Sequence, residues 1–217
     1  MIIRPYGPED KPFIEKLISD QEVSRVFRGW SEAPDLQDWL CYVVDGCGVV
    51  VGEPMGGGNY IGSSAFLPEH YGWVAGAAQV KALHHAFLNT DLVTIYAQAE
   101  SDVPRGVANT KSLGFDYWID QNGTMIGRLD FMRWVGTSKH LERESNRFFD
   151  KYEVSLPYQK MVYAVMACCK NGQIMKGMYQ WFVYERLVKD APDLIPTNES
   201  FTRFSYGGKS IGMDGIW

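Results

Sequence analysis

The sequence predicts an α/β (α+β) fold, in which a mixed, mostly antiparallel sheet is flanked by helices and followed by a C-terminal helical extension. Up to residue 134, apolar runs typical of strands alternate with segments of helical apolar spacing. Asp-Gly and Asn-Gly dipeptides separate several of the apolar runs, as they do in β-hairpins. After residue 134 the strand signals stop. We therefore expect a sheet-containing domain over residues 1–134 and a helical extension with an irregular tail over residues 135–217.

The first third of the chain is expected to contain a strand, a helix and an antiparallel meander. Phe13, Ile14, Leu17 and Ile18 have the i, i+3, i+4 spacing of a helix that faces a core. Asp45-Gly46 is the strongest short hairpin signal in the chain. The expected elements are a strand at 1–5, a helix over 8–19, a helix or loop over 21–30, strands over 40–44, 47–51 and 59–67, and turns at 45–46 and 53–58.

The middle third is expected to alternate helices and strands. Residues 74–89 place apolar side chains on one helical face, and residues 92–98 read as a strand buried on both sides, typical of a parallel strand. A second helix is expected over 103–112. Residues 115–120 and 125–134 then predict a hairpin around Gln121-Asn122-Gly123.

The last third is expected to be helical. A charged helix is predicted over 138–151, a helix over 156–169 with Ser155 as its N-cap, and a third helix over 173–190. The tail from Ala191 is rich in Pro, Gly and Ser, which predicts no regular structure. Since the 156–169 helix is apolar on nearly every side, it must be buried inside the domain or in an interface.

Composition excludes several function classes. The net charge is −5, with 10 basic and 17 acidic residues before residue 134, so clustered positive charge for nucleic-acid binding is lacking. No apolar run approaches the roughly 18–20 residues that span a bilayer, and no signal-peptide pattern begins the chain. The four cysteines form no metal-ligand spacing. We expect a cytoplasmic, reduced protein without metal or membrane contact.

The stretch from Leu67 to Phe115 carries the strongest functional signal. It reads as a strand end, a glycine-containing loop at Tyr71–Gly76, a helix, a strand and a second helix. A helix that starts directly after a strand offers free backbone N–H groups and a positive dipole end to an anion. The order of elements therefore predicts a site for a phosphate-bearing cofactor.

Residues 1–133 resemble the GNAT acyltransferase superfamily in the order of their motifs. The matching features are Met1–Pro5 followed by Pro8-Glu9-Asp10 and a helix, the Lys81–Gln98 helix-turn-strand segment, and the Leu113-Gly114-Phe115 corner. This resemblance implies an acetyl-CoA-dependent N-acetyltransferase acting on a small amine or a protein amino group.

The resemblance also implies the site residues. Its cofactor loop, Arg/Gln-x-x-Gly-x-Gly/Ala, falls on Tyr71, Val74 and Gly76, and only Gly76 matches. The family's frequent Asn and general-acid Tyr fall on Val103 and Thr110. The implied cofactor-binding residues are Phe66, Leu67, Gly72, Trp73, Val74, Ala75, Gly76 and Ala77, where a backbone N–H near Phe66–Leu67 serves as the oxyanion donor.

Three side chains are candidates for catalysis. Glu100 follows the carboxyl end of the 92–99 strand, where ligands bind in α/β folds, and is the first choice as general base. Glu69 and His70 come next, at the start of the loop. Each of these acids also fits a solvated loop carboxylate, and His84 and His85 fit structural histidines better than catalytic ones.

A second hypothesis follows from the departures at Tyr71, Val74, Val103 and Thr110. In this alternative the chain is a catalytically degenerate scaffold that has lost acetyl-CoA, similar to divergent GNAT-like proteins of bacteriophages that act on a host enzyme. Residues 155–190 would then bind a partner protein, since Met and aromatic side chains suit adaptable interfaces. The same residues could also form a homodimer. The acceptor amine cannot be read from the chain.

Overall fold

A computed structural model gives the fold of residues 3–20, 23, 32–100, 104–137, 139–151, 153, 156–171, 176–177, 203–206 and 209–212. The described chain divides into two compact units. The first unit comprises Met1–Leu83, Thr94–Ser112 and Asp116–Arg128, and the second comprises His84–Val93, Leu113–Phe115 and Leu129–Trp217. The predicted boundary at residue 134 stays a prediction.

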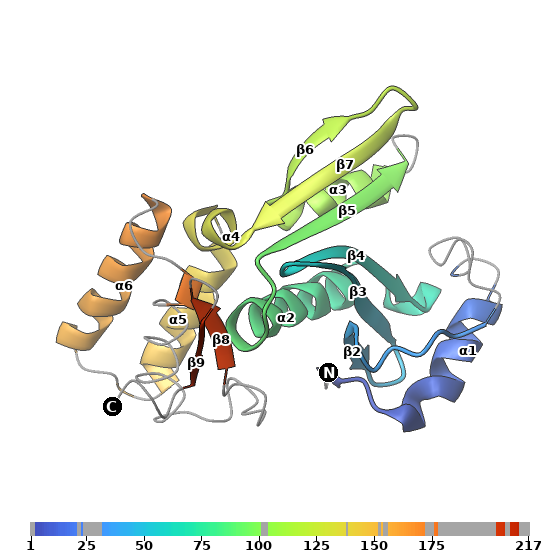
Figure 1. Ribbon diagram of the computed structural model, residues 1–217, viewed down its shortest axis with the longest axis horizontal. Helices are drawn as coiled ribbons and strands as arrows, with labels where there is room; N and C mark the ends of the chain where they lie inside the picture. Colours follow the sequence, from blue (N-terminus) through green and yellow to red (C-terminus); the bar gives the residue numbers. More distant parts are fainter. Residues whose placement is uncertain are drawn as a thin grey trace. The chain divides into compact units, whose positions relative to one another are not determined.

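Seven strands form one sheet in the order β1-β2-β3-β4-β5-β7-β6 (Figure 1). The pairs β1–β2, β2–β3, β3–β4 and β6–β7 are antiparallel, and β4–β5 is parallel. The predicted mixed, mostly antiparallel sheet with flanking helices is therefore confirmed. The strands are β1 (Ile3–Pro5), β2 (Leu40–Val44), β3 (Gly48–Gly56), β4 (Asn59–Phe66), β5 (Thr94–Glu100), β6 (Asp116–Ile119) and β7 (Thr124–Asp130).

The helices follow the predicted order except for α4, which begins at Phe131, where a strand was predicted. A 3-10 turn, η1 (Pro8–Asp10), leads into the first helix, and η2 (Pro68–His70) precedes the second. The region over 21–30 lies outside the described residues apart from Val23, as do Ser155 and most of 173–190. The helices are α1 (Lys11–Ser19), α2 (Trp73–Asn89), α3 (Pro104–Ser112), α4 (Phe131–Thr137), α5 (Lys139–Lys151) and α6 (Leu156–Lys170).

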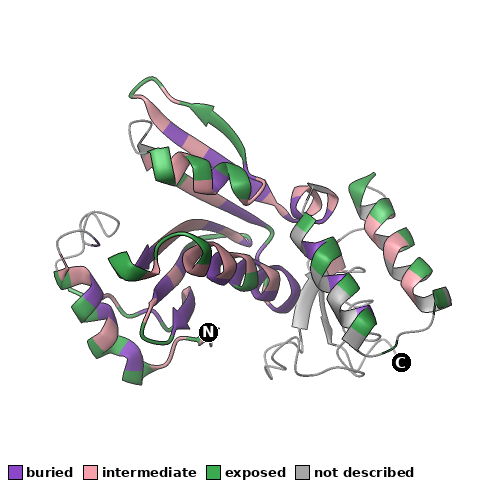
Figure 2. Cartoon of the chain, turned by 180° about the vertical axis from the view of Figure 1, so that it is seen from behind, coloured by how far each residue is buried: buried purple, intermediate pink, exposed green. Residues whose placement is uncertain are grey.

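The first unit buries its sheet between α1 and α2. Successive side chains of a strand point to opposite faces, so neighbouring residues of one strand serve different cores. Val43 of β2 packs with Ile14 and Leu17 of α1. Its neighbour Val44 packs with Ala78 of α2. Figure 2 shows buried residues along these strands and along the helices beside them.

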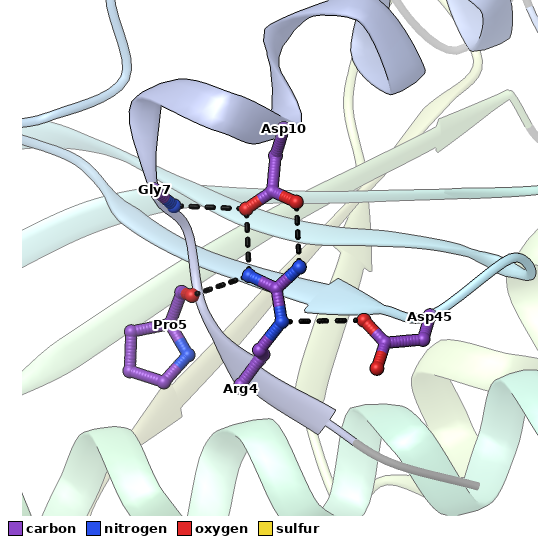
Figure 3. A network of polar contacts seen from close by, with 5 residues as sticks. All are labelled: Arg4, Pro5, Gly7, Asp10 and Asp45. Carbon is purple, nitrogen blue, oxygen red and sulfur yellow. Dashed lines mark hydrogen bonds and ion pairs between the residues drawn. The ribbon is translucent and has the colours of Figure 1, made fainter.

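A polar network fixes the N-terminal strand to the first helix (Figure 3). The Arg4 guanidinium donates to both carboxylate oxygens of Asp10, at 2.7 and 2.6 Å, and its Nε lies 3.3 Å from Asp45. Asp10 also accepts the Gly7 N–H at 2.9 Å. One buried carboxylate thereby joins β1, the turn into α1 and, through Arg4, the β2–β3 turn.

The second unit is built on an aromatic cluster. The rings of Phe87 and Trp134 stack with centroids 5.0 Å apart, and Phe131 lies within 6.1 Å of both. His84 meets Trp134 edge-on at 5.8 Å. Because the three aromatic residues come from the end of α2 and from α4, this cluster joins segments far apart in the sequence.

Helix α6 has exposed and half-buried side chains among those that are described, and the burial predicted for its apolar residues stays a prediction. None of its residues with a described side chain is buried, and Leu156 is 60 % exposed (Figure 2). It contacts α4, where Gly136 lies against Lys170, and the Tyr163 hydroxyl donates to Asn146 of α5. After α6, Lys176 donates through Nζ to the carbonyls of Thr90 and Leu92, and burial lowers its pKa to about 7.

Three predicted boundaries were wrong. Glu53–Gly56 belongs to β3, so the turn is confined to Gly57 and Gly58, both with positive φ. Strand β5 starts at Thr94 rather than residue 92. Strand β7 ends at Asp130, whose Oδ1 accepts the Arg133 N–H at 2.8 Å and so caps α4.

The tail was predicted to be irregular, but the structure contains a two-stranded hairpin of β8 (Arg203–Tyr206) and β9 (Lys209–Gly212). Residues 207 and 208 between the two strands are both glycine, a dipeptide suited to a two-residue hairpin turn. Among the residues that the structure describes, no helix has both the length and the apolar character needed to cross a bilayer.

Candidate functional site

The candidate site lies where β4 ends and α2 begins, within the first unit. Leu67 leaves the strand, η2 carries Glu69 and His70, and Gly72 immediately precedes α2. Gly72 has φ of +87°, a conformation that residues with a Cβ rarely adopt. Glycine at this position lets the chain turn sharply into the helix. Glu69 is exposed there and His70 is half-buried.

The first backbone amides of α2 are available to an anion. Those of Trp73, Val74 and Ala75 have no intrahelical acceptor, because a helix leaves its first amides unpaired. The Gly76 N–H, in contrast, donates to the Gly72 carbonyl at 3.0 Å. Since α2 starts one residue earlier than predicted, the available donors shift toward Trp73, and Gly76 and Ala77 bond within the helix.

The surroundings of these amides are open. A Cβ built on Gly76 would meet no heavy atom within 4 Å. Trp73 is 78 % exposed, and Tyr71 beside it is 40 % exposed. The first turn of α2 thus combines unpaired donors, free space at Gly76 and exposed aromatic surface.

Strands β4 and β5 separate in front of this turn. Their parallel pairing runs from Asn59–Thr94 to Gly62–Ala97 and stops there among the described residues. Yet β4 continues to Phe66 and β5 continues to Glu100. Figure 1 shows the two strands diverging toward their carboxyl ends. The last four residues of β4 therefore pair with β3 on one side only.

The register of β3 and β4 tells which backbone groups of β4 face the diverging strand. The Leu67 N–H donates to the Cys47 carbonyl at 2.8 Å, across the β3 side. In an antiparallel pair the direction of the backbone groups alternates, so Phe66, opposite Gly48, directs its N–H away from β3. Ser64 does the same. Of the two predicted oxyanion donors, the Leu67 N–H is already bonded to β3, whereas the Phe66 N–H points to the side where β4 no longer pairs with β5.

The predicted catalytic side chains are only partly described. Glu100 is the last residue of β5, and its side chain lies outside the described residues, as does Val103. Thr110, which the sequence resemblance aligns with a general-acid Tyr, is buried and donates through Oγ1 to the Gly106 carbonyl at 3.0 Å. The Thr110 hydroxyl is thus hydrogen-bonded within its own helix, α3.

The two adjacent histidines of α2 are packed into the structure. Burial lowers the pKa of both to about 4, and the charge of His85 adds to the effect on His84. At neutral pH both rings are uncharged. This state agrees with the structural role preferred from the sequence.

Sequence reasoning missed a polar pair beside the site, in which a buried Gln79 bonds to the half-buried Ser64. Gln79 of α2 is 6 % exposed, and its Nε2 donates to Ser64 Oγ of β4 at 2.5 Å. The available signal was a lone amide in the apolar run from Val74 to Val80. Amide side chains are seldom buried without partners, so such a residue marks a position where the interior is polar.

Comparisons with known proteins identify the fold to which the sheet and the β4–α2 site belong. No family model and no curated protein sequence matches the chain. A solved structure of spermidine N-acetyltransferase from Vibrio cholerae, in complex with CoA and spermine, aligns with a TM-score of 0.51 and 16 % identity, covering 62 % of this chain and 97 % of that one. Ribosomal-protein-alanine N-acetyltransferase from Brucella melitensis aligns with a TM-score of 0.48 and 12 % identity, covering 60 % of this chain and 100 % of that one. The strand order, the parallel β4–β5 pair and the first of these likenesses show that this chain has the GNAT fold.

Proposed function

We propose that the protein is an acetyl-CoA-dependent N-acetyltransferase acting on a small amine or a protein amino group. The observation that carries the proposal is the combination of unpaired amides at Trp73, Val74 and Ala75 with the separation of β4 from β5 directly before them. Helix N-termini bind phosphate groups through such amides. The spermidine N-acetyltransferase that was solved in complex with CoA and spermine shares this fold.

The residues fit the two ends of acetyl-CoA. The amides of Trp73, Val74 and Ala75 would hold the pyrophosphate, and the open space at Gly76 lets it approach the helix closely. The Phe66 N–H would donate to the thioester oxygen as negative charge develops on it. When bound, acetyl-CoA supplies an activated acetyl group.

The acceptor amine must lose a proton before it can attack. Glu100, at the end of β5, would take this proton, with Glu69 and His70 as the alternatives near the start of α2. These roles follow from the position of each residue in the fold. Exchange of each one for its uncharged isostere, Gln or Asn, with turnover measured over a pH series, would separate them.

Isothermal titration of the full chain with acetyl-CoA tests the proposal, with two variants at Gly76. Gly76→Ala and Gly76→Asp both add a Cβ in open space, so both should fold. An acidic residue near a helix N-terminus even favours the helix. It repels phosphate, however, so Gly76→Asp should bind acetyl-CoA at least about tenfold more weakly than Gly76→Ala.

Each outcome decides a different part of the proposal. Equal affinity of the two Gly76 variants would rule out the helix N-terminus as the phosphate site. Binding without release of CoA thiol in the presence of polyamines or amine-bearing peptides would remove the enzymatic role. No binding at millimolar acetyl-CoA would overturn the proposal altogether.

One observation favours a second candidate, a degenerate scaffold that binds a partner protein through residues 155–190. Thr110, which the resemblance aligns with the general acid, donates its hydroxyl proton to the Gly106 carbonyl, which argues against an acid role. Light scattering separates a homodimer from a monomer. A chain that binds no cofactor and turns over no amine, yet forms a stoichiometric complex that is lost on deletion of 138–217, would support the scaffold.

A further inference from the structure

The pair formed by the buried Gln79 and the half-buried Ser64 has one polar end without a partner among the described residues. Gln79 Nε2 donates to Ser64 Oγ at 2.5 Å, whereas Gln79 Oε1 has no hydrogen-bond partner among the described residues. If the amide is turned by 180°, Oε1 accepts from Ser64 and the NH₂ group becomes the unpaired end. In either orientation, a group that is 6 % exposed keeps unused hydrogen-bonding capacity.

This pair lies where β4 has lost its parallel neighbour. Ser64 is two residues beyond Gly62, the last residue of β4 that pairs with β5. Alternation along the strand places Gly62 and Ser64 on one face. That face is the one covered by α2, because Phe66, on the same face, packs with Ala78. The unpaired end of Gln79 therefore lies under α2 beside the separated strands.

Beyond Gly62, where the Ile95 side chain of β5 lies against the strand, the neighbouring positions are small. Gly62 pairs with Ala97, and Ala99 follows on the same face of β5. On α2, Ala75 and Ala78 contact the same side of the sheet. Small side chains keep backbone groups within reach of a ligand, and Gln79 with Ser64 supplies side-chain polarity among them. The arrangement suits a narrow ligand chain that carries polar groups.

We infer that Gln79, held by Ser64, binds a secondary amide of the ligand chain that enters between β4 and β5. This inference rests on the proposed function, since the pantetheine arm of CoA is a narrow chain with two secondary amides. A secondary amide has both a donor and an acceptor, so it complements either orientation of the Gln79 side chain. Gln79 is thus a binding residue for the arm of the cofactor, separate from the phosphate site at Trp73–Ala75.

The experiment compares two ligands on one variant. CoA contains the pantetheine arm, and adenosine 3′,5′-bisphosphate lacks it. Gln79→Met keeps the length of the side chain and removes the amide. Isothermal titration should show CoA binding about tenfold weaker in Gln79→Met than in wild type, the loss expected for one hydrogen bond. Binding of adenosine 3′,5′-bisphosphate should stay unchanged. Gln37→Met, which removes an exposed amide before β2, is the matched control.

Two results would overturn the inference about Gln79 and leave the proposed function standing. Equal CoA affinity of wild type and Gln79→Met would mean that the pair only joins α2 to β4. An equal loss for both ligands would mean that the substitution disturbs the packing of α2. If wild type bound neither ligand, the proposed function would fall and the inference with it. Should Gln79→Met not fold, Ser64→Ala, which frees the Gln79 amide, must selectively weaken CoA for the inference to stand.

Discussion

The Arg4–Asp10 pair allows a quantitative test of what holds the N-terminal strand to the sheet domain. Asp10→Asn keeps the size of the side chain and its acceptor for the Gly7 N–H, but removes the charge that receives two bonds from Arg4. The Asp10 side chain is 7 % exposed and that of Arg4 is 39 % exposed. We therefore expect a cost between that of a buried pair and that of a surface pair.

The magnitude follows from these two limits. Breaking a buried pair costs about 3–5 kcal/mol, and an exposed pair contributes about 0–1 kcal/mol. With Arg4 partly screened by water, Asp10→Asn should lower the free energy of unfolding by about 2 kcal/mol. For a chain of this length, that corresponds to a melting temperature about 4–8 °C lower. Asp45→Asn, at a contact of 3.3 Å whose carboxylate is 44 % exposed, should cost under about 0.5 kcal/mol.

The Arg4–Asp10 pair also makes the stability of the fold depend on pH. The hydrogen bonds from Arg4 hold the pKa of Asp10 below its ordinary value of 3.8. Its contribution is therefore complete above pH 3.8 and is lost as the pH falls through the lower pKa of the folded state. Thermal unfolding followed by circular dichroism at neutral and acidic pH measures both effects. Equal costs for Asp10→Asn and Asp45→Asn, or a wild-type advantage that persists in strong acid, would refute the reasoning.

Two further predictions concern glycine and histidine. Gly48→Ala places a Cβ 2.3 Å from the Ala65 carbonyl oxygen, so urea unfolding should show a free energy of unfolding lower by about 3 kcal/mol or more. Gly76→Ala adds a Cβ in open space within a helix, so its free energy of unfolding should be unchanged or higher by up to about 1 kcal/mol. Similar values for the two variants would contradict the packing argument. Burial lowers the pKa of His85 from 6.5 to about 4, so the unfolded state binds the extra proton, and stability should be complete above pH 6.5 and fall by about 3 kcal/mol toward pH 4. Because burial lowers the pKa of His84 to the same value, His85→Gln should remove only about half of the acid loss caused by the two histidines, and an unchanged pH profile would show that His85 does not contribute to it.

The parts of the fold that were predictable depend on local patterns. The hairpin at Asp45-Gly46 forms because Gly46 has φ of +68°, which glycine adopts without strain. The parallel strand β5 was foreseen from the apolar run after residue 91, as was helix α1 from its apolar face. Each of these signals is contained within a few residues of the chain.

The misplaced boundaries depend on contacts that local patterns do not contain. Phe131–Trp134 continues an apolar run and reads as strand, but Asp130 caps a helix there, and the ring of Trp134 stacks on Phe87. Long-range aromatic packing therefore decides the secondary structure of this segment. Glu53–Gly56 shows the opposite case, since pairing with β4 extends a strand through residues with weak strand propensity.

The candidate site shows the same division. That an anion could bind at the start of α2 follows from the order of strand, loop and helix, which the sequence shows directly. The order of elements does not show which amides are available, because this depends on the conformation of Gly72 and on the hydrogen bond from the Gly76 N–H to the Gly72 carbonyl. Likewise, Leu67 and Phe66 are equivalent donors in the sequence, and only the register with β3 engages Leu67 and directs Phe66 toward the separated strands. Substitutions in this site should therefore be designed from backbone direction, since three of its proposed donors, at Trp73, Val74 and Ala75, are main-chain groups that no change of side chain removes.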